Sequence, residues 1–304
     1  MSQKTSKHEQ SISSQTISLR LDDVLKVGLG FVALISALLL LVIIVFLGFE
    51  AWPALIVSET NTSGVFSFFN HDGWFPLEGK LGLLPMLWAS LAVMVGSVLL
   101  AAPFGFLCAI FATFYAPPLL ARAYFSMVSL LAGIPSVVYG LWGLTVLVPL
   151  VAEWQPPGAS LFSAIIVLAL MILPTVALTS RSAIAAVPPS LIQGAAALGI
   201  SLKGIVLGVV FPAARKGVVS GVLLAVARAL GETMAVLMVA GNVVNTPTGL
   251  FEPVRVLTAN IALEMAYATE LHRSGLFVSG LLLMLLVLAI AWIAVRISRE
   301  PAHG

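Results

Sequence analysis

The feature that most limits how this chain can fold is a series of six long apolar runs. A transmembrane helix needs about 20 consecutive apolar residues. Hydrophobic residues make up 60% of the 304-residue chain and charged residues only 9%, too few to cover a water-soluble domain. The sequence therefore predicts an all-α integral membrane protein with six transmembrane helices. We place them near residues 27–49, 83–107, 124–150, 160–180, 217–240 and 275–295.

Two of these runs need comment. The first follows a polar segment, residues 1–26, but it is too long for the apolar part of a signal peptide and no small-x-small cleavage site follows it. We therefore expect a retained first transmembrane helix. In the third run, Pro135 and Gly140 can break the span into a half-helix. Residues 298–304 form a short C-terminal tail.

The distribution of lysine and arginine predicts the orientation of the chain. Loops on the cytoplasmic side of a membrane are enriched in these residues, and one side here has eleven against three. The eleven are Lys4, Lys7, Arg20, Lys26, Arg122, Arg181, Lys203, Arg215, Lys216, Arg296 and Arg299, and the three are Lys80, Arg255 and Arg273. Both termini should therefore face the cytoplasm. The segments 50–82 and 241–274 become outer loops, the first rich in aromatic residues that suit a short packed element.

Several chemistries have no support in the sequence. A phosphate-binding G-x-x-x-x-G-K-[ST] loop is absent: Gly79-Lys80 is followed by Leu81, and Trp74 stands at the position of the first glycine. The single Cys108 and four scattered histidines give neither a metal site nor a catalytic triad. A net charge of +2 does not indicate a nucleic-acid partner. We expect no enzyme activity and no cofactor, so any ATP hydrolysis must belong to another polypeptide.

The longest inner loop, residues 181–216, contains two short predicted helices. Ser190 is placed to cap a helix over 191–198, and Gly199 is a typical residue at its end. Ser201 can cap a second helix that runs to Val210, before Pro212 interrupts it. The apolar run 204–211 is too short to span and should lie at the interface or pack under the bundle.

The first of these helices is poor in side-chain bulk. Gly194 is followed by three alanines. Such a helix can lie close against the backbone of another protein, or it can pack on its own bundle; the sequence leaves both readings open.

Arg228 and Glu232 are the only charges in the run 217–240. Four residues apart on a helix, they would share one face and could form an ion pair. Arg228 would lie roughly 16 Å from Gly217 along the axis, near the middle of the bilayer. Each charge costs about 2.5–3.5 kcal/mol there. The pair either fixes helix register or lines a pathway, and the small residues Gly217 and Gly221 on the same face suggest a close subunit contact.

The inner loop resembles the "EAA…G…I-LP" loop of ABC importer permeases, through Gly199 and the later Phe211-Pro212. Gln193 stands where that motif has glutamate, and Phe211 replaces its leucine. The resemblance implies a coupling helix seated in a cleft of an ATPase subunit. The residues that it assigns to this contact are Gln193, Gly194, Ala195, Ala196 and Gly199.

Two further stretches narrow the resemblance. ARALGETMAVLMVAGN (227–242) and AGIPSVVYGLWGL (132–144) are similar to segments of PstC-type permeases of phosphate ABC importers. This implies the type I ABC importer permease fold, with residues 83–297 as the transmembrane domain. It also implies a multi-pass protein of the bacterial inner membrane. The expected partners are a related second permease subunit, two copies of an ABC ATPase and an outer phosphate-binding protein.

On this reading, Arg228 offers a planar, permanently charged donor group to a phosphate oxyanion. Glu232 would hold and neutralise the guanidinium while the path is empty. Thr233, Ser136 and Tyr139 are further candidates for the path. The alternatives are a permease for sulfate, molybdate or tungstate, a secondary anion transporter, and a structural membrane subunit.

Overall fold

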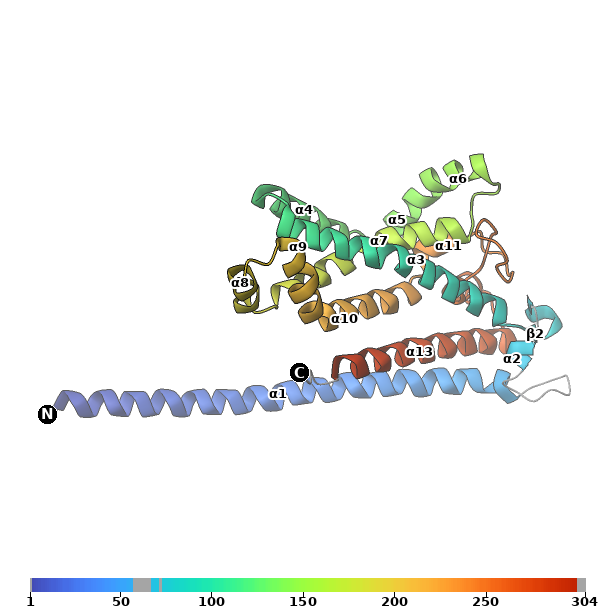
Figure 1. The fold of residues 1–304 in the computed structure, drawn as a ribbon. Helices are drawn as coiled ribbons and strands as arrows, with labels where there is room; N and C mark the ends of the chain where they lie inside the picture. The colour runs from blue at the N-terminus through green and yellow to red at the C-terminus, as the bar shows by residue number, and fades with distance from the viewer. Residues whose placement is uncertain (1, 57–66, 71–72, 300–304) are drawn as a thin grey trace. The chain divides into compact units, whose positions relative to one another are not determined.

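The computed structural model describes residues 2–56, 67–70 and 73–299, and most of them are helical (Figure 1). It divides into two units, residues 1–50 and residues 51–304. The first unit belongs to α1 (Ser2–Ile56), which includes the polar segment expected to be a tail. Residues 57–66 and 71–72 of the outer loop and 300–304 of the C-terminal tail lie outside the described residues.

The described residues contain six helices long and apolar enough to cross a membrane, which confirms the predicted number. Their bounds are Leu25–Ile56, Leu84–Tyr115, Ser136–Trp154, Leu161–Ala185, Leu202–Leu230 and Glu270–Ile293. The chain is thus a multi-pass membrane protein.

The third span is broken, as its proline and glycine residues allowed. A 15-residue helix, α4 (Pro118–Ala132), ends before Pro135, which then begins α5 (Ser136–Trp142) as its N-cap. The span continues through a π-helical turn, η4 (Gly143–Leu147), and α6 (Val148–Trp154). Proline disfavours helical backbone in the residue before it, which explains a break at this point.

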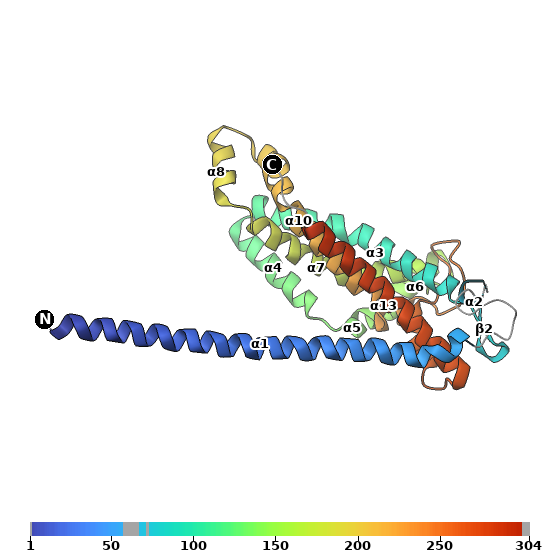
Figure 2. The ribbon, with the colours of Figure 1, turned by 90° about the horizontal axis from the view of Figure 1, so that it is seen from below.

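The second unit is organised around α7 (Leu161–Ala185). It packs against α3 (Leu84–Ile110), α10 (Phe211–Leu230) and α4, and its Leu168, Ile172 and Val176 are almost fully buried (Figure 2). In both views α8 (Pro189–Ala197) lies at one end of this unit and the hairpin strand β2 (Lys80–Leu81) at the other. We refer to these as the α8 end and the hairpin end.

The fifth span has different bounds from those predicted. It runs without interruption through α9 (Leu202–Ile205), the π-helical η5 (Val206–Val210) and α10, and it stops at Leu230 instead of Ala240. Pro212 does not end it, because the wider turn of η5 precedes the proline, and such bulges accommodate irregular hydrogen bonding. The apolar run 204–211 is therefore part of this span.

The small-residue face of α10 packs within the chain. A Cβ atom on Gly217 would lie 2.7 Å from Cβ of Ala183, and one on Gly221 would overlap the Thr179 side chain. Both neighbours belong to α7. These glycines therefore let α10 approach a helix of the same chain, and the subunit contact expected at this face stays a prediction.

The inner loop follows its predicted course with one change. α8 begins after Pro188, so Ser190 lies inside the helix and does not cap it. Gly199 has a φ of +73°, a left-handed conformation that favours glycine and ends the helix as predicted. Ser201 caps α9 by accepting a hydrogen bond of 3.3 Å from the Gly204 N–H, also as predicted.

Short elements form a small core at the hairpin end. They are α2 (Ser67–Asn70), β1 (Trp74–Phe75), η2 (Pro76–Glu78) and β2, and they join α12 (Leu257–Glu264) and α13 (Glu270–Arg299). In the antiparallel hairpin Trp74 pairs with Leu81. Phe68, Trp74 and Leu81 are buried there, whereas Trp52 is exposed. The packed outer element that the sequence predicted is present in the described part of this loop.

The backbones of α5 and α11 (Met234–Val239) meet at Gly140. A Cβ atom on this glycine would lie 2.8 Å from Ala235 Cα and 2.8 Å from Met238 Sδ. One of these atoms is backbone and cannot move aside easily. Glycine is therefore required for this contact.

Gly140→Ala should lower the stability of the folded chain by about 1–3 kcal/mol, because overpacking forces the two helices apart. Thermal unfolding of the purified protein in detergent measures this. Gly194→Ala is the matched control, since no atom lies within 4 Å of its added Cβ. Equal unfolding temperatures for the two variants would contradict the close contact.

A loop carboxylate stabilises the segment that covers the start of α7. Glu252 accepts hydrogen bonds from Thr248 Oγ1 (2.6 Å), Thr248 N (3.1 Å) and Asn245 Nδ2 (3.4 Å), while its carbonyl oxygen accepts one from Leu161 N (2.9 Å). The hydrogen bond from the Thr248 hydroxyl is the largest cause that lowers the pKa of Glu252 below its ordinary value. The loop therefore favours the ionised form.

This stabilisation should be complete above the ordinary glutamate pKa and should be lost as pH falls through the lowered pKa of the folded loop. Hydrogen–deuterium exchange over 245–252, corrected for the intrinsic effect of pH, should accelerate in that acidic range. Glu252→Gln should remove the pH dependence. The same acceleration in this variant would show that another group is responsible.

Candidate functional site

The helix of the fifth span ends at Leu230, and residues 231–233 separate it from α11. The main-chain carbonyl of Glu232 accepts a hydrogen bond of 2.9 Å from Thr258 Oγ1 in α12. Its carboxylate accepts one of 3.0 Å from the Ala235 N–H at the start of α11. Both bonds hold the non-helical backbone in place, and they satisfy polar groups that water would otherwise serve.

Arg228 lies in the last turn of α10, just before this break. Its guanidinium is exposed in the single chain, and Nη1 donates a hydrogen bond of 3.3 Å to Thr175 Oγ1. Thr175 lies near the middle of the 25-residue α7. A permanently charged group is therefore placed level with the middle of the central helix, with a neutral partner.

The expected ion pair between Arg228 and Glu232 is not formed: within the described part of the chain, neither side chain has an ionic partner. The reason is the backbone. A pair four residues apart needs a continuous helix, and α10 ends at Leu230. Glu232 instead turns its carboxylate towards α11.

The other pathway candidates lie on elements that meet around this break. α5, which carries Ser136 and Tyr139, packs on α11. The Tyr139 hydroxyl donates a hydrogen bond of 2.9 Å to the Leu131 carbonyl, and Arg228 lies within electrostatic range of that hydroxyl. Thr233 donates a long bond of 3.4 Å to the Gly231 carbonyl. Ser136 begins α5 and is half-buried.

Four of the five residues expected at an ATPase contact are exposed on or just after α8: Gln193, Gly194, Ala196 and Gly199. Ala195 differs. It is 7% exposed and packs in a buried cluster with Ile205 and Val210. The helix thus has one side on its own bundle and an open side of small residues, which combines the two readings that the sequence left open.

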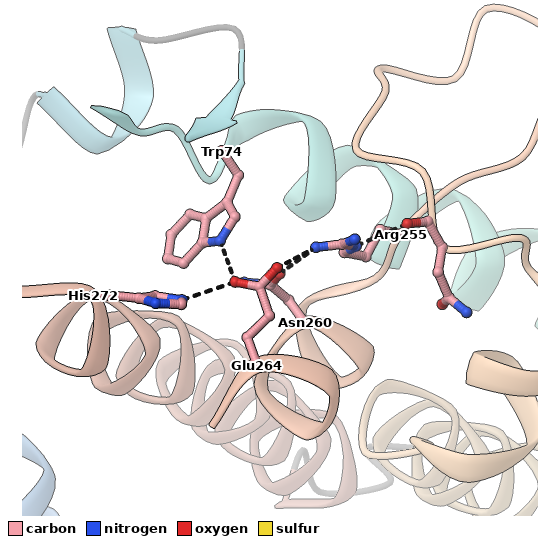
Figure 3. Close-up of polar contacts among 6 residues, drawn as sticks. Trp74, Arg255, Asn260, Glu264 and His272 are labelled. Carbon is pink, nitrogen blue, oxygen red and sulfur yellow. Dashed lines mark hydrogen bonds and ion pairs between the residues drawn. The ribbon is translucent and has the colours of Figure 1, made fainter. Parts of the chain in front are cut away.

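A buried polar cluster at the hairpin end was not predicted (Figure 3). Glu264 Oε1 accepts a hydrogen bond of 2.6 Å from Arg255 Nη1, and Oε2 accepts one of 2.6 Å from Trp74 Nε1. His272 Nε2 lies 2.8 Å from the same Oε2. Arg255 also donates to the Asn260 side chain at 3.1 Å.

The cluster joins four segments that are far apart in the sequence: the hairpin, the strand-like stretch before α12, α12 and the start of α13. The Glu264 side chain is 10% exposed and that of Arg255 is 19% exposed. Each charge has an opposite partner or several hydrogen bonds, as burial requires. In this position the cluster links the loops at the hairpin end to one another.

Some of these residues left a signal in the sequence. Asn260 and Glu264 are four apart and would share a helix face close after Arg255. Thr175 is a hydroxyl residue directly after a proline in an apolar run. Nothing in the sequence around Trp74 or His272 indicated that either side chain would contact Glu264. In the described residues, no group of three His, Cys, Asp or Glu side chains is placed to hold a metal ion.

Glu264→Gln should destabilise the protein by about 1.5–3 kcal/mol, because the half-buried Arg255 loses its counter-charge and a charge-assisted hydrogen bond. Chemical unfolding of the purified protein measures the change. Glu78→Gln is the control: it breaks the exposed Lys80–Glu78 pair (2.9 Å), which is worth about 0–1 kcal/mol. If the free energy of unfolding falls no more than in the control, the cluster does not stabilise these loops.

Comparison with known proteins shows to which family the chain belongs. The family model described as "Binding-protein-dependent transport system inner membrane component" matches residues 101–300. The chain is 35% identical over 277 residues to the phosphate transport system permease protein PstC of Pasteurella multocida, covering 84% of this chain and 85% of that protein. It is 35% identical over 291 residues to the probable ABC transporter permease protein YqgH of Bacillus subtilis, covering 92% and 93%.

Solved structures agree on the fold. A chain of the MetNI methionine ABC transporter, in an inward-facing conformation, matches with a TM-score of 0.58 and 21% identity over 71% of this chain and 94% of that one. An amino acid ABC transporter solved with histidines matches with a TM-score of 0.55 and 16% identity, covering 74% and 95%. The fold is that of type I ABC importer permeases. The chain therefore belongs to the inner-membrane components of binding-protein-dependent transport systems, and it is a transporter subunit that works with ABC transporter partners.

Proposed function

We propose that the chain is a permease subunit of an ATP-driven importer of inorganic phosphate. The relatives that carry this assignment are named as phosphate transport permeases, and they match the chain over most of its length. The observation that supports it in the molecule is Arg228, a guanidinium with no carboxylate partner among the described residues, at the break of the fifth span.

The partners follow from this assignment. The subunit pairs with a related second permease, two copies of an ABC ATPase and an outer phosphate-binding protein, in a bacterial inner membrane. The excess of lysine and arginine supports an orientation with both termini and the α8 end on the cytoplasmic side. The exposed side of α8 is then the coupling surface, with Gln193 as a neutral counterpart to the usual glutamate.

Arg228 is the group that meets the anion. A guanidinium donates several N–H groups in one plane, which matches the oxygens of hydrogen phosphate. In the empty state it bonds weakly to Thr175, so an arriving anion exchanges a neutral partner for a charged one. One positive charge gives weak binding, which a path needs so that the ion can leave. Thr233, Ser136 and Tyr139 supply further hydroxyls nearby.

Glu232 takes a different role from the one that the sequence suggested. Its carboxylate ties down the start of α11 instead of neutralising Arg228. We infer that it keeps the break open and in register. Because its position is beside the path, its negative charge also limits how long an anion stays at Arg228.

Arg228→Gln should reduce phosphate uptake by about tenfold or more, the factor that corresponds to losing one hydrogen bond to a charged group. The measurement is radiolabelled phosphate uptake by cells whose only phosphate importer contains this subunit. Membrane levels and assembly with the partners must equal those of the wild type. Unchanged uptake would contradict a role for Arg228 in the path.

Glu232 provides the matched comparison in the same assay. Glu232→Gln keeps an oxygen that can accept from Ala235 N, so it should keep most of the uptake, whereas Glu232→Ala should lose it.

Competition by sulfate, molybdate and tungstate tests the substrate. Stronger competition by one of these than by unlabelled phosphate would assign the importer to that oxyanion.

A further inference from the structure

A second arginine site lies between α4 and α7, towards the α8 end. A cavity of about 510 Å³ opens there on the surface of the described chain. It is lined by Arg122, Phe125, Ser126, Ser129, Leu130 and Arg181. The two guanidinium groups thus face one space that also contains two hydroxyls and two large apolar side chains.

The arginines are held in ways that leave donors free. The Arg181 guanidinium carbon lies 3.9 Å above the centre of the ring of Phe125, a residue that is 5% exposed. Stacking uses the face of a guanidinium and leaves its in-plane N–H groups available. Arg122 and Ser126 are one turn apart on α4, so both lie on the same side of that helix.

No counter-charge is available from the neighbouring sequence. Glu153 is the only acidic residue between Glu78 and Glu232, and it belongs to α6, away from the start of α4 (Figures 1 and 2). Within the described residues, neither Arg122 nor Arg181 has a carboxylate within 4.0 Å. Two positive charges that share a cavity without an acid repel each other, and an anion between them would relieve this.

The cavity is separate from the Arg228 site. Thr175, which bonds to Arg228, and Arg181 are six residues apart on α7, which corresponds to about 9 Å along the axis and about 120° around it. The two arginine sites therefore lie on different sides of the central helix. They also lie at different levels of the bundle.

We propose that this cavity binds a phosphate group through Arg122, Arg181 and the Ser126 hydroxyl. Pairs of arginines and hydroxyls suit the oxygens of phosphate, and basic pockets between transmembrane helices on the cytoplasmic side bind the headgroups of anionic lipids. Leu130, which is 73% exposed, offers an apolar surface that matches the glycerol and acyl region of a phospholipid. Free phosphate has the same headgroup chemistry and is the other source.

The test uses the assembled transporter in an Arg228→Gln background, which removes the pathway arginine. The complex is purified from membranes that contain phosphatidylglycerol, and the retained lipid is measured by mass spectrometry. In a second arm, lipid-depleted complex in neutral detergent is titrated with radiolabelled orthophosphate. The variants are Arg122→Gln and Arg122→Gln/Arg181→Gln. The single variant guards against misfolding, because Arg122 has no bonding partner in the described structure.

Arg296→Gln is the matched control: this arginine also stacks on a ring, with 4.7 Å between its guanidinium carbon and the Trp292 centroid, but it does not line the cavity. We expect the double variant to retain about tenfold less phosphatidylglycerol than the control, the factor for one lost hydrogen bond to a charged group. Loss of orthophosphate binding alone would also support the site and identify free phosphate as its ligand.

Two results would overturn the proposal. One is retention of both probes at the control level in the double variant. The other concerns a Ser126→Cys variant in a Cys108→Ala background. If the assembled complex with the partner permease fully protects this cysteine from a thiol-reactive label, the cavity is an interface between subunits. Arg122→Lys/Arg181→Lys, which keeps the two charges, should retain more lipid than the glutamine variant.

Discussion

The constraint on which this structure depends is that hydrocarbon offers no hydrogen bonds to the backbone. Each transmembrane segment must satisfy its own N–H and C=O groups, so irregular backbone survives at membrane depth only where protein or a water-filled path surrounds it. The chain has non-helical backbone beside two of its spans, at 133–135 between α4 and α5 and at 231–233 between α10 and α11. Tyr139 bridges the first break, and Glu232 and Thr258 hold the second. These side chains make an interrupted helix tolerable, and the interruption is what makes room for a polar site.

The two arginines with the best-defined surroundings show how burial separates a structural charge from a functional one. Arg255 has a carboxylate at 2.6 Å and further acceptors around it, so its charge is compensated within the loops that it links. Among the residues that the structure describes, Arg228 has only the Thr175 hydroxyl as a partner, at 3.3 Å. A buried pair contributes little that a ligand can use, whereas an uncompensated guanidinium retains most of its attraction for an anion. The difference lies in partners supplied by tertiary packing, since both residues are arginines near apolar helices.

Much of the fold could be predicted from the sequence. The wrong predictions concern features that depend on contacts between distant segments. Apolar run length gave six spans, and Gly199 and Ser201 marked the end of one inner helix and the start of the next. The fifth span was misplaced because its composition stays apolar through the break at Gly231, while its true start is hidden behind Pro212. Gly217 and Gly221 correctly indicated close helix packing, but spacing alone does not tell which helix is the neighbour, and it is α7 of the same chain.

The sequence by itself determined that the chain is built for a lipid bilayer, how many transmembrane helices it has, how its lysine and arginine residues are distributed, and which residues can bind an anion. These properties depend on composition and on the local order of residues. Only the tertiary structure decided which charges are compensated. It separated Arg228 from Glu232 by ending a helix between them, and it brought Trp74, Arg255 and His272 to Glu264 across long stretches of chain. It also put Arg122 beside Arg181. Electrostatic interactions act over a few ångströms in space, and distance along the sequence does not fix distance in the fold.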